Sequence, residues 1–209
     1  MNKKSGSTRR LTLFALFMAL ELMLASTPLG FVRLGMIGAT TLHIPVIIAA
    51  ITMGKGAGAA LGLIFGLSSV VNATVNPLPT SFVFSPFLEF AGVSGGTRSL
   101  IVAIVPRVLV GFLSGAAYEA LQHKSHQSLA VTAAAVVGTL SNTVLVLGGI
   151  YIFFGRAYAA AVNVAFESLI SVILTVVATN GVAEIVLAIL LSLPICRGLR
   201  HAVPRMTGV

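Results

Sequence analysis

A few polar side chains inside long apolar stretches are the residues of this sequence that could do chemistry. They are Glu21, His43, Arg107, Asn142 and Glu184. A polar group is costly to bury in apolar surroundings, so such side chains generally pair with one another or bind a solute. Three of them, Glu21, Arg107 and Asn142, lie about eight residues inside their stretch, a depth of about 12 Å in a helix. This common depth predicts a site for a polar solute that opens to the outer side.

Each of these residues also has a purely structural interpretation. Arg107 and Glu184 could neutralise each other as an ion pair. Asn142 could form a hydrogen bond between helices, and His43, two residues before Pro45, could satisfy a backbone group that the proline frees. The convergence of several polar groups at one depth favours a binding site.

The residue sets that catalysis requires are missing. The sequence has no Asp and a single cysteine, Cys196, which excludes an internal disulfide and a cysteine-based metal cluster. Gly54-Lys55-Gly56 lacks the rest of a Walker sequence and predicts a turn. No His and carboxylate residues have metal-ligand spacing, and no Ser, His and acid set is apparent. We therefore expect no catalytic residue, no metal, no cofactor and no energy source in this chain, which is not expected to be an enzyme.

The composition places these polar residues in a membrane protein. Of the 209 residues, 57% are hydrophobic and 9% are charged, whereas a soluble domain carries about 25% charged residues. So few charges could not cover the surface of a soluble protein, and the apolar excess must face lipid. The net charge of +8 would suggest a nucleic acid partner in a soluble protein; here we expect none and interpret the charge as an orientation signal.

Long apolar stretches predict an all-α protein, a polytopic membrane bundle that residues 1–209 form as a single domain. The stretches are 11–29, 42–53, 57–71, 100–121, 129–154 and 182–195, and residues 155–178 are apolar but interrupted. We count six transmembrane helices, with 155–178 as a partial or tilted helix. A cleaved signal peptide is the alternative for 11–29, but Glu21 and the length of the stretch argue against it.

The positive residues predict how the bundle is oriented. Residues 1–10 and the tail 196–209 are basic and are expected in the cytoplasm, which places both termini inside. The cytoplasmic set is Lys3, Lys4, Arg9, Arg10, Lys55, Lys124, Arg197, Arg200 and Arg205, and the outer loops hold Arg33, Arg98 and Arg156. Residues 72–98 form a long outer loop whose Phe82, Phe84 and Phe87 could close over a ligand.

Small residues recur at four-residue spacing in three helices. The glycines are Gly58, Gly62 and Gly66 in one helix and Gly111 and Gly115 in the next, and their spacing predicts close helix packing. Ala15 and Ala19 have the same spacing but lie about 120° and 160° from Glu21 around their helix. If Glu21 faces the interior, the alanines face outward and form a groove in which another helix could dock.

Several stretches of the chain look like a known family. A basic N-terminus, six predicted helices, the outward Ala15-Leu-Phe-Met-Ala19 and the lack of a nucleotide site resemble the substrate-binding S components of energy-coupling factor (ECF) vitamin transporters. The stretches ATTLHIPVIIAAI, GLIFGLSSVVNATVNP, SFVFSPF and VPRVLVG are similar to the subfamily with pantothenate-type members. The resemblance covers nearly the whole chain and is less specific for the vitamin than for the family.

The resemblance implies a division of labour between subunits. An S component is a multi-pass protein of the bacterial plasma membrane that captures a water-soluble vitamin at its outer side. It then docks on a module of one transmembrane scaffold subunit and two ATPase subunits, and the docking face carries over to Ala15 and Ala19. The expected substrate-binding residues are Asn76, Phe84, Arg107, Asn142, Asn180 and Glu184. Among them Arg107 would bind a substrate carboxylate, the amides would hold hydroxyl and amide groups, and Phe84 would cover the apolar part.

Other functions stay open from the sequence. With two carboxylates, Glu21 and Glu184, against one guanidinium, Arg107, the predicted site has a formal negative charge. Such a charge disfavours an anion such as pantothenate unless another cation, such as His43, Arg33 or Arg98, takes part. An S component for another vitamin or precursor, of the folate, riboflavin, hydroxymethylpyrimidine or pyridoxine type, is therefore an alternative. A self-sufficient secondary transporter would need an internal repeat or a coupling-ion site, and an intramembrane enzyme would need a nucleophile or metal set; neither is evident.

Overall fold

The computed structural model describes residues 3–34, 37–123 and 126–202, with side chains described over 8–31, 40–123 and 126–199. Of the predicted cytoplasmic positive charges, Lys124 and Arg205 lie outside the described residues. The helices are α1 (Lys3–Ala25), α2 (His43–Met53), α3 (Lys55–Val75), α4 (Gly96–Leu121), α5 (Gln127–Ala161), α6 (Leu169–Val176) and α7 (Val182–Ala202). The strands are β1 (Phe31–Leu34), β2 (Ile37–Thr40), β3 (Glu89–Phe90) and β4 (Val93–Ser94), which pair as two small antiparallel hairpins. The predicted all-α class describes the chain apart from these hairpins.

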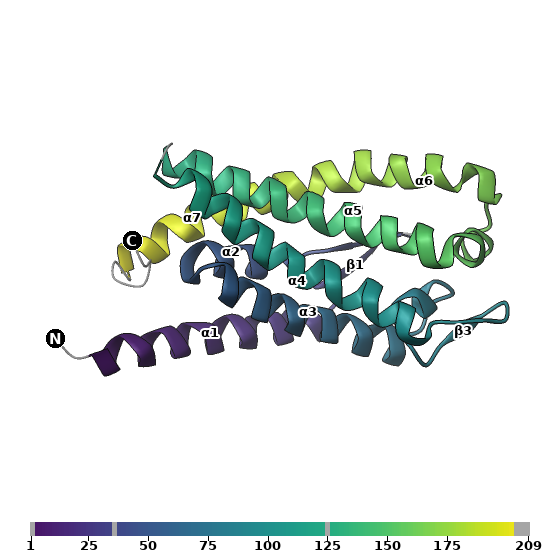
Figure 1. Ribbon diagram of the computed structural model, residues 1–209, viewed down its shortest axis with the longest axis horizontal. Helices are drawn as coiled ribbons and strands as arrows, with labels where there is room; N and C mark the ends of the chain where they lie inside the picture. Colours follow the sequence, from purple (N-terminus) through teal and green to yellow (C-terminus); the bar gives the residue numbers. More distant parts are fainter. Residues whose placement is uncertain (1–2, 35–36, 124–125, 203–209) are drawn as a thin grey trace.

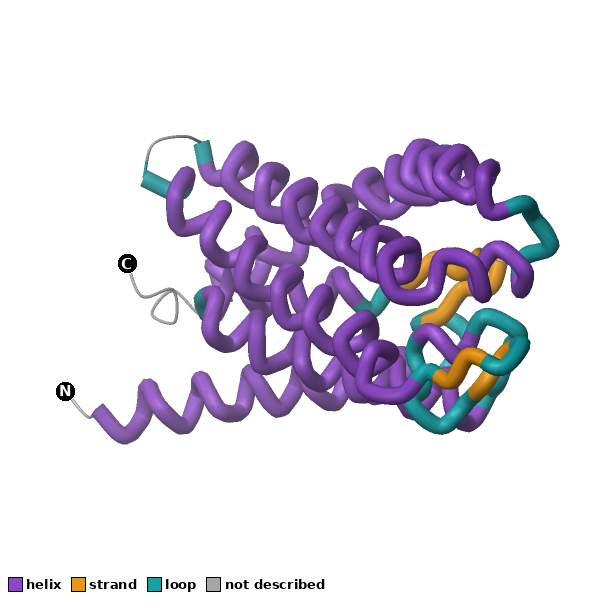
Figure 2. Tube along the Cα trace, turned by 45° about the vertical axis from the view of Figure 1, so that its right-hand side comes forward, coloured by secondary structure: helices purple, strands orange, loops and turns teal. Residues whose placement is uncertain are grey.

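The long helices run side by side along one axis (Figure 1). α1 begins and α7 ends at one end of the bundle, which we call the terminal end, and β3 and β4 lie at the other, which we call the hairpin end (Figure 1). Figure 2 shows the same separation after a turn of 45°. Hydrogen bonds tie the terminal end together, from Arg10 Nη2 to the Met53 carbonyl at 2.7 Å and from Arg197 Nη2 to Ser128 Oγ at 2.6 Å.

Helix α2 is short and lies inside the bundle. All of its residues are buried, and it contacts α1, α3, α4, α5 and α7. A helix that is apolar on almost every side is suited to such a buried position. At 1.5 Å per residue it is about 17 Å long, too short to cross a bilayer, and the β1–β2 hairpin precedes it along the chain.

Glycines bring α3 and α4 into backbone contact. A Cβ added to Gly58 would lie 2.8 Å from the Gly111 carbonyl oxygen, and one added to Gly62 would lie 2.8 Å from the carbonyl carbon of Arg107. At Gly66 the Ala103 carbonyl oxygen would be 3.0 Å away. Side chains have no room at these positions, which confirms the predicted packing role of the glycine stripe.

Several predicted boundaries differ from the structure. The first helix ends at Ala25 rather than at residue 29, and the last continues to Ala202 rather than ending at residue 195. Residues 155–161 continue α5, which ends where Asn163 adopts a left-handed φ of 56°; 155–178 is therefore not a separate partial helix. The segment predicted as the loop 72–98 is shorter, because α3 continues to Val75 and α4 begins at Gly96. Asn76 ends α3, since Pro77 disfavours a helical conformation at the residue before it.

Four stretches of the described residues are long and apolar enough to cross a membrane. They are Lys55–Val75, Gly96–Leu121, Gln127–Ala161 and Phe166–Leu199. The last one contains α6, a π-helical turn at Val177–Gly181 and α7, so these elements form one continuous span. Leu67, Leu174 and Leu190 are among the apolar side chains exposed on the outside of these spans, as expected of a protein that lipid surrounds. The count of six transmembrane helices stays a prediction.

Candidate functional site

Arg107 is a buried cation in the middle of α4. Its side chain is 4% exposed, and Nη1 donates a hydrogen bond to the Val102 carbonyl at 2.8 Å. Nε is buried without a hydrogen-bond partner. A buried donor without a partner is costly, and such groups often mark where a ligand binds. The guanidinium is therefore incompletely satisfied by the protein alone.

Two aromatic rings flank the Arg107 guanidinium. Its Cζ lies 5.3 Å from the Phe65 ring centroid and 5.1 Å from that of Phe84, within the range of cation–π interactions. Phe65 comes from α3, which the glycine contact at Gly62 brings against α4. Phe84 directly follows the 3-10 turn Ser81–Val83, in the segment between α3 and α4. The predicted site residues Arg107 and Phe84 are thus in contact.

Glu184 connects three elements near Arg107. Its Oε1 accepts a hydrogen bond from the Thr40 backbone N–H at 3.1 Å, and its Oε2 accepts one from Thr143 Oγ1 at 3.3 Å. Arg107 and Glu184 attract each other electrostatically, but they form no ion pair within 4.0 Å; the ion pair of the described chain joins Lys55 and Glu119 at 2.8 Å. Arg107 and Glu184 therefore do not form the direct ion pair that the structural interpretation of these residues requires.

Asn142 lies on α5 at the level of Arg107. Helices α4 and α5 are antiparallel neighbours, and a Cβ at Gly149 would lie 3.2 Å from Val102, which sets Arg107 beside the turn of α5 that contains Asn142. The Asn142 Oδ1 and the Thr139 Oγ1, one turn away, are both buried without a hydrogen-bond partner. Polar groups on two adjacent helices thus lack partners at one level of the bundle.

Asn180 belongs to the π-helical turn between α6 and α7. Its side chain is half-buried, and its Oδ1 accepts a long hydrogen bond from Thr179 Oγ1 at 3.4 Å. A Cβ at the adjacent Gly181 would lie 3.9 Å from Thr143, so the π-helical turn packs beside the residue that binds Glu184. Single π-helical turns inside longer helices frequently occur at functional sites.

Asn76 is not part of this cluster. It is exposed at the end of α3, where its Nδ2 donates to Asn72 Oδ1 at 3.1 Å. It follows Phe65 by three helical turns, about 16 Å along the axis. The structure therefore places it at the hairpin end, away from Arg107.

Glu21 and His43 are both fully buried, Glu21 on α1 and His43 at the start of α2. Glu21 is 0% exposed with both carboxylate oxygens unpartnered, and α1 packs mainly on α2 and α3 rather than on α4, α5 or α7. The His43 ring nitrogens form no hydrogen bond, although the Thr40 backbone lies near the ring. Thr40 also donates its backbone N–H to Glu184, so His43 lies beside the residue that binds Glu184. Glu21, in contrast, belongs to a helix that packs mainly on α2 and α3.

Ala15 and Ala19 lie on the outside of α1. Both are exposed, and the intervening Leu16 is 64% exposed, whereas Glu21 points inward. The alanines therefore face away from the bundle, as the helical spacing predicts for an inward Glu21.

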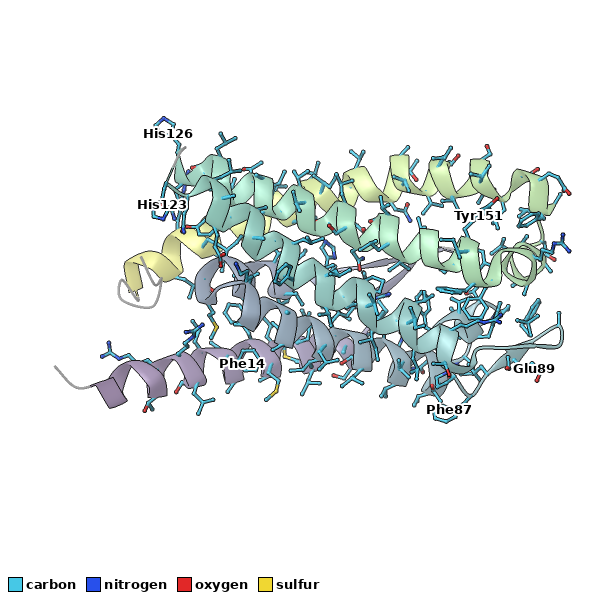
Figure 3. The ribbon with its side chains drawn as sticks, in the orientation of Figure 1. Phe14, Phe87, Glu89, His123, His126 and Tyr151 are labelled. Carbon is cyan, nitrogen blue, oxygen red and sulfur yellow. The ribbon has the colours of Figure 1, made fainter. Side chains whose placement is uncertain are left out.

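An aromatic cluster holds the segment between α3 and α4 at the hairpin end. The Phe82 ring stacks on Phe90 at 5.7 Å and meets Phe154 of α5 edge to face at 5.6 Å. Figure 3 shows Phe87 and Glu89 on the outside of this end and Tyr151 on α5 nearby, with His123 and His126 at the opposite end. The cluster positions Phe84 over Arg107, two residues after Phe82.

The sequence did not single out several residues of the site. They are Thr40, Phe65, Thr139 and Thr143. Thr139 and Thr143 flank Asn142 on α5, so proximity in sequence could have found these two. Thr40 and Phe65 come from distant elements and carry no such signal.

Comparisons with known proteins show the family of the chain. Residues 9–196 match the family model described as "ECF transporter, substrate-specific component". The chain is 40% identical over 164 residues to the pantothenic acid transporter PanT of Lactococcus lactis subsp. cremoris (strain MG1363). The aligned residues cover 78% of this chain and 78% of that protein. Since the family model spans most of the chain, the protein belongs to the family of substrate-specific components of ECF transporters.

Proposed function

We propose that this S component binds pantothenate between α4, α5 and α7, at the site around Arg107. The observation that carries the proposal is Arg107, a buried guanidinium between Phe65 and Phe84 whose Nε–H has no partner. The similarity to a pantothenic acid transporter supports the identity of the vitamin.

The groups of pantothenate correspond to the groups around Arg107. Its carboxylate would accept hydrogen bonds from the guanidinium, a charge-assisted interaction that is strong in an apolar site. Its amide and hydroxyl groups would bind Asn142, Thr139 and the free lone pairs of Glu184. Its geminal methyl groups would pack on Phe84. Glu21 lies on α1, which packs mainly on α2 and α3 and is not one of the three helices of the proposed site, so its carboxylate would contribute less to the negative charge that argued against an anion.

The site would open to the outside of the cell. The terminal end carries Arg10, Lys55 and Arg197, and positive residues collect on the cytoplasmic side of membrane proteins. The hairpin end would then face outward. Arg107 is about 16 Å from the start of α4 and about 21 Å from its end at 1.5 Å per residue, so the site would lie in the outer half of the protein, in the bacterial plasma membrane.

Transport would depend on partner subunits. The described part of the chain has no nucleotide-binding sequence, and the exposed Ala15 and Ala19 form a flat stripe on α1 that another helix could approach closely. This stripe would dock on a transmembrane scaffold subunit, and two ATPase subunits would supply the energy.

The test is calorimetric titration of the purified protein with pantothenate, folate, riboflavin, thiamine and pyridoxine. Pantothenate should bind, and Arg107→Ala should weaken it by more than about tenfold, because hydrogen bonds to charged groups contribute ~1.5–3 kcal/mol. Asn76→Ala, a polar site that lies away from Arg107, is the matched control and should leave the affinity unchanged. Tight binding of another vitamin instead would correct the substrate, and binding of none would refute the function.

A further inference from the structure

Pro106 leaves a carbonyl of α4 without its helical donor. A proline in a helix interior has no N–H, so the carbonyl four residues earlier loses its hydrogen bond. Pro106 lies inside α4, and the carbonyl that it frees is that of Val102. The side chain of the next residue replaces the missing donor: Arg107 Nη1 donates a hydrogen bond to the Val102 carbonyl at 2.8 Å.

This hydrogen bond determines where the guanidinium lies. Helical side chains lean toward the N-terminus of their helix, which for α4 is the hairpin end. The bond to Val102 holds the Arg107 head group along this direction, at the point where Phe65 and Phe84 flank it at 5.3 and 5.1 Å. One N–H of Nη1 is thereby bound to the protein, and Nε is left without a partner.

We propose that Pro106 is a positioning residue that makes the site selective for ligands with a carboxylate. It acts through Arg107: by freeing the Val102 carbonyl it anchors one nitrogen of the guanidinium and orients the remaining donors toward the ligand. The proposal rests on the proposed function for the identity of the ligand, but the position of Arg107 can be tested without any ligand.

A second proline provides a matched control. Pro194 lies inside α7 and is exposed, and no side chain of the described residues donates to the carbonyl of Leu190, which it frees. Replacing Pro194 therefore restores a helical hydrogen bond without releasing an arginine. A general effect of proline on helix bending or stability would appear in both variants.

The experiment compares Pro106→Ala with Pro194→Ala in the full-length protein. Binding of pantothenate and of panthenol, in which an alcohol replaces the carboxylate, is measured by calorimetry. In Pro106→Ala the restored N–H competes for the Val102 carbonyl and releases the guanidinium, so the affinity for pantothenate should fall about tenfold while that for panthenol changes less than about twofold. Pro194→Ala should keep the wild-type ratio of the two affinities. An unchanged ratio in Pro106→Ala overturns the proposal.

A second measurement separates this proposal from the proposed function. In ligand-free protein labelled with 15N-arginine, the Arg107 side-chain signal, identified by its loss in Arg107→Lys, should exchange slowly with water. It should exchange faster in Pro106→Ala and be unaffected in Pro194→Ala; slow exchange in Pro106→Ala overturns the positioning role. If wild-type protein binds no pantothenate, the proposed function and the carboxylate selectivity fail, and the exchange measurement alone decides the positioning role. Pro106→Val, which also restores the N–H but keeps more bulk, repeats both measurements if Pro106→Ala does not fold.

Discussion

Glu184 Oε1 accepts a hydrogen bond from the backbone N–H of Thr40 at 3.1 Å, across 144 residues of sequence. The same carboxylate accepts from Thr143 on α5. One side chain of α7 thus holds the end of the β1–β2 hairpin and a turn of α5 next to Arg107. This relationship makes Glu184 both a structural junction and a wall of the proposed site.

Removing the Glu184 carboxylate should weaken both ligand binding and the fold. Glu184→Ala removes the carboxylate acceptor of the Thr40 N–H, and it leaves the Thr143 hydroxyl with the Thr139 carbonyl as its acceptor. A lost hydrogen bond to a charged group costs about 1.5–3 kcal/mol. We expect at least a tenfold loss of pantothenate affinity by calorimetry and a lower unfolding temperature. Glu184→Gln, which keeps one acceptor oxygen, should lose less. Glu167→Ala, at an exposed position, is the control; equal behaviour of the two alanine variants would contradict the junction.

Phe84 and Phe87 should differ in their effect on binding, although they lie three residues apart. Phe84 lies 5.1 Å from the Arg107 Cζ, whereas Phe87 is 80% exposed. A cation–π contact in a desolvated site contributes up to ~2 kcal/mol, so Phe84→Ala should lower pantothenate affinity roughly tenfold. Phe87→Ala should leave it within about twofold. Calorimetric titration of both variants checks this, and a larger loss for Phe87→Ala would show that the outer face of this segment holds the ligand.

Gly62 should tolerate no side chain. A Cβ there would lie 2.8 Å from the carbonyl carbon of Arg107, so Gly62→Ala must push α3 and α4 apart, and overpacking costs ~1–3 kcal/mol. We expect a lower unfolding temperature in detergent and weaker pantothenate binding, because Phe65 moves with α3. Gly56→Ala is the control, since nothing lies within 4 Å of its added Cβ. Unchanged stability of Gly62→Ala would mean that the two helices are not in backbone contact.

Bulky residues on the outer stripe of α1 should separate binding from transport. Ala15→Trp and Ala19→Trp add volume on an exposed face, so the folded protein and its pantothenate affinity should be unchanged. Uptake into proteoliposomes that contain the complete complex should be abolished, because the partner helix can no longer approach closely. The control is Leu63→Trp, which places the same side chain at an exposed position of α3 and should leave both binding and uptake unchanged. Simultaneous loss of binding and transport in the alanine variants would instead make the pair part of the internal packing.

The sequence by itself determined the class of the protein. Its few charges could not cover the surface of a soluble protein, so its apolar composition requires a lipid environment. The helical patterns follow from this environment, because a backbone that crosses lipid must satisfy its own hydrogen bonds. The glycine spacing predicted close helix packing, and the spacing of Ala15 and Ala19 from an inward Glu21 predicted that the two alanines face outward. These features depend on one helix at a time, so the 3.6-residue period is enough to read them.

Only the tertiary structure decided which polar residues meet. Arg107 and Phe84 are in contact because the aromatic cluster around Phe82 fastens the intervening segment, and Asn76 is excluded because α3 carries it to the hairpin end. The link from Thr40 to Glu184 joins elements whose sequences carry no sign of each other. Residues at equal depth in different helices become neighbours only if the helices pack with those faces together. That choice depends on long-range packing, which no local pattern encodes.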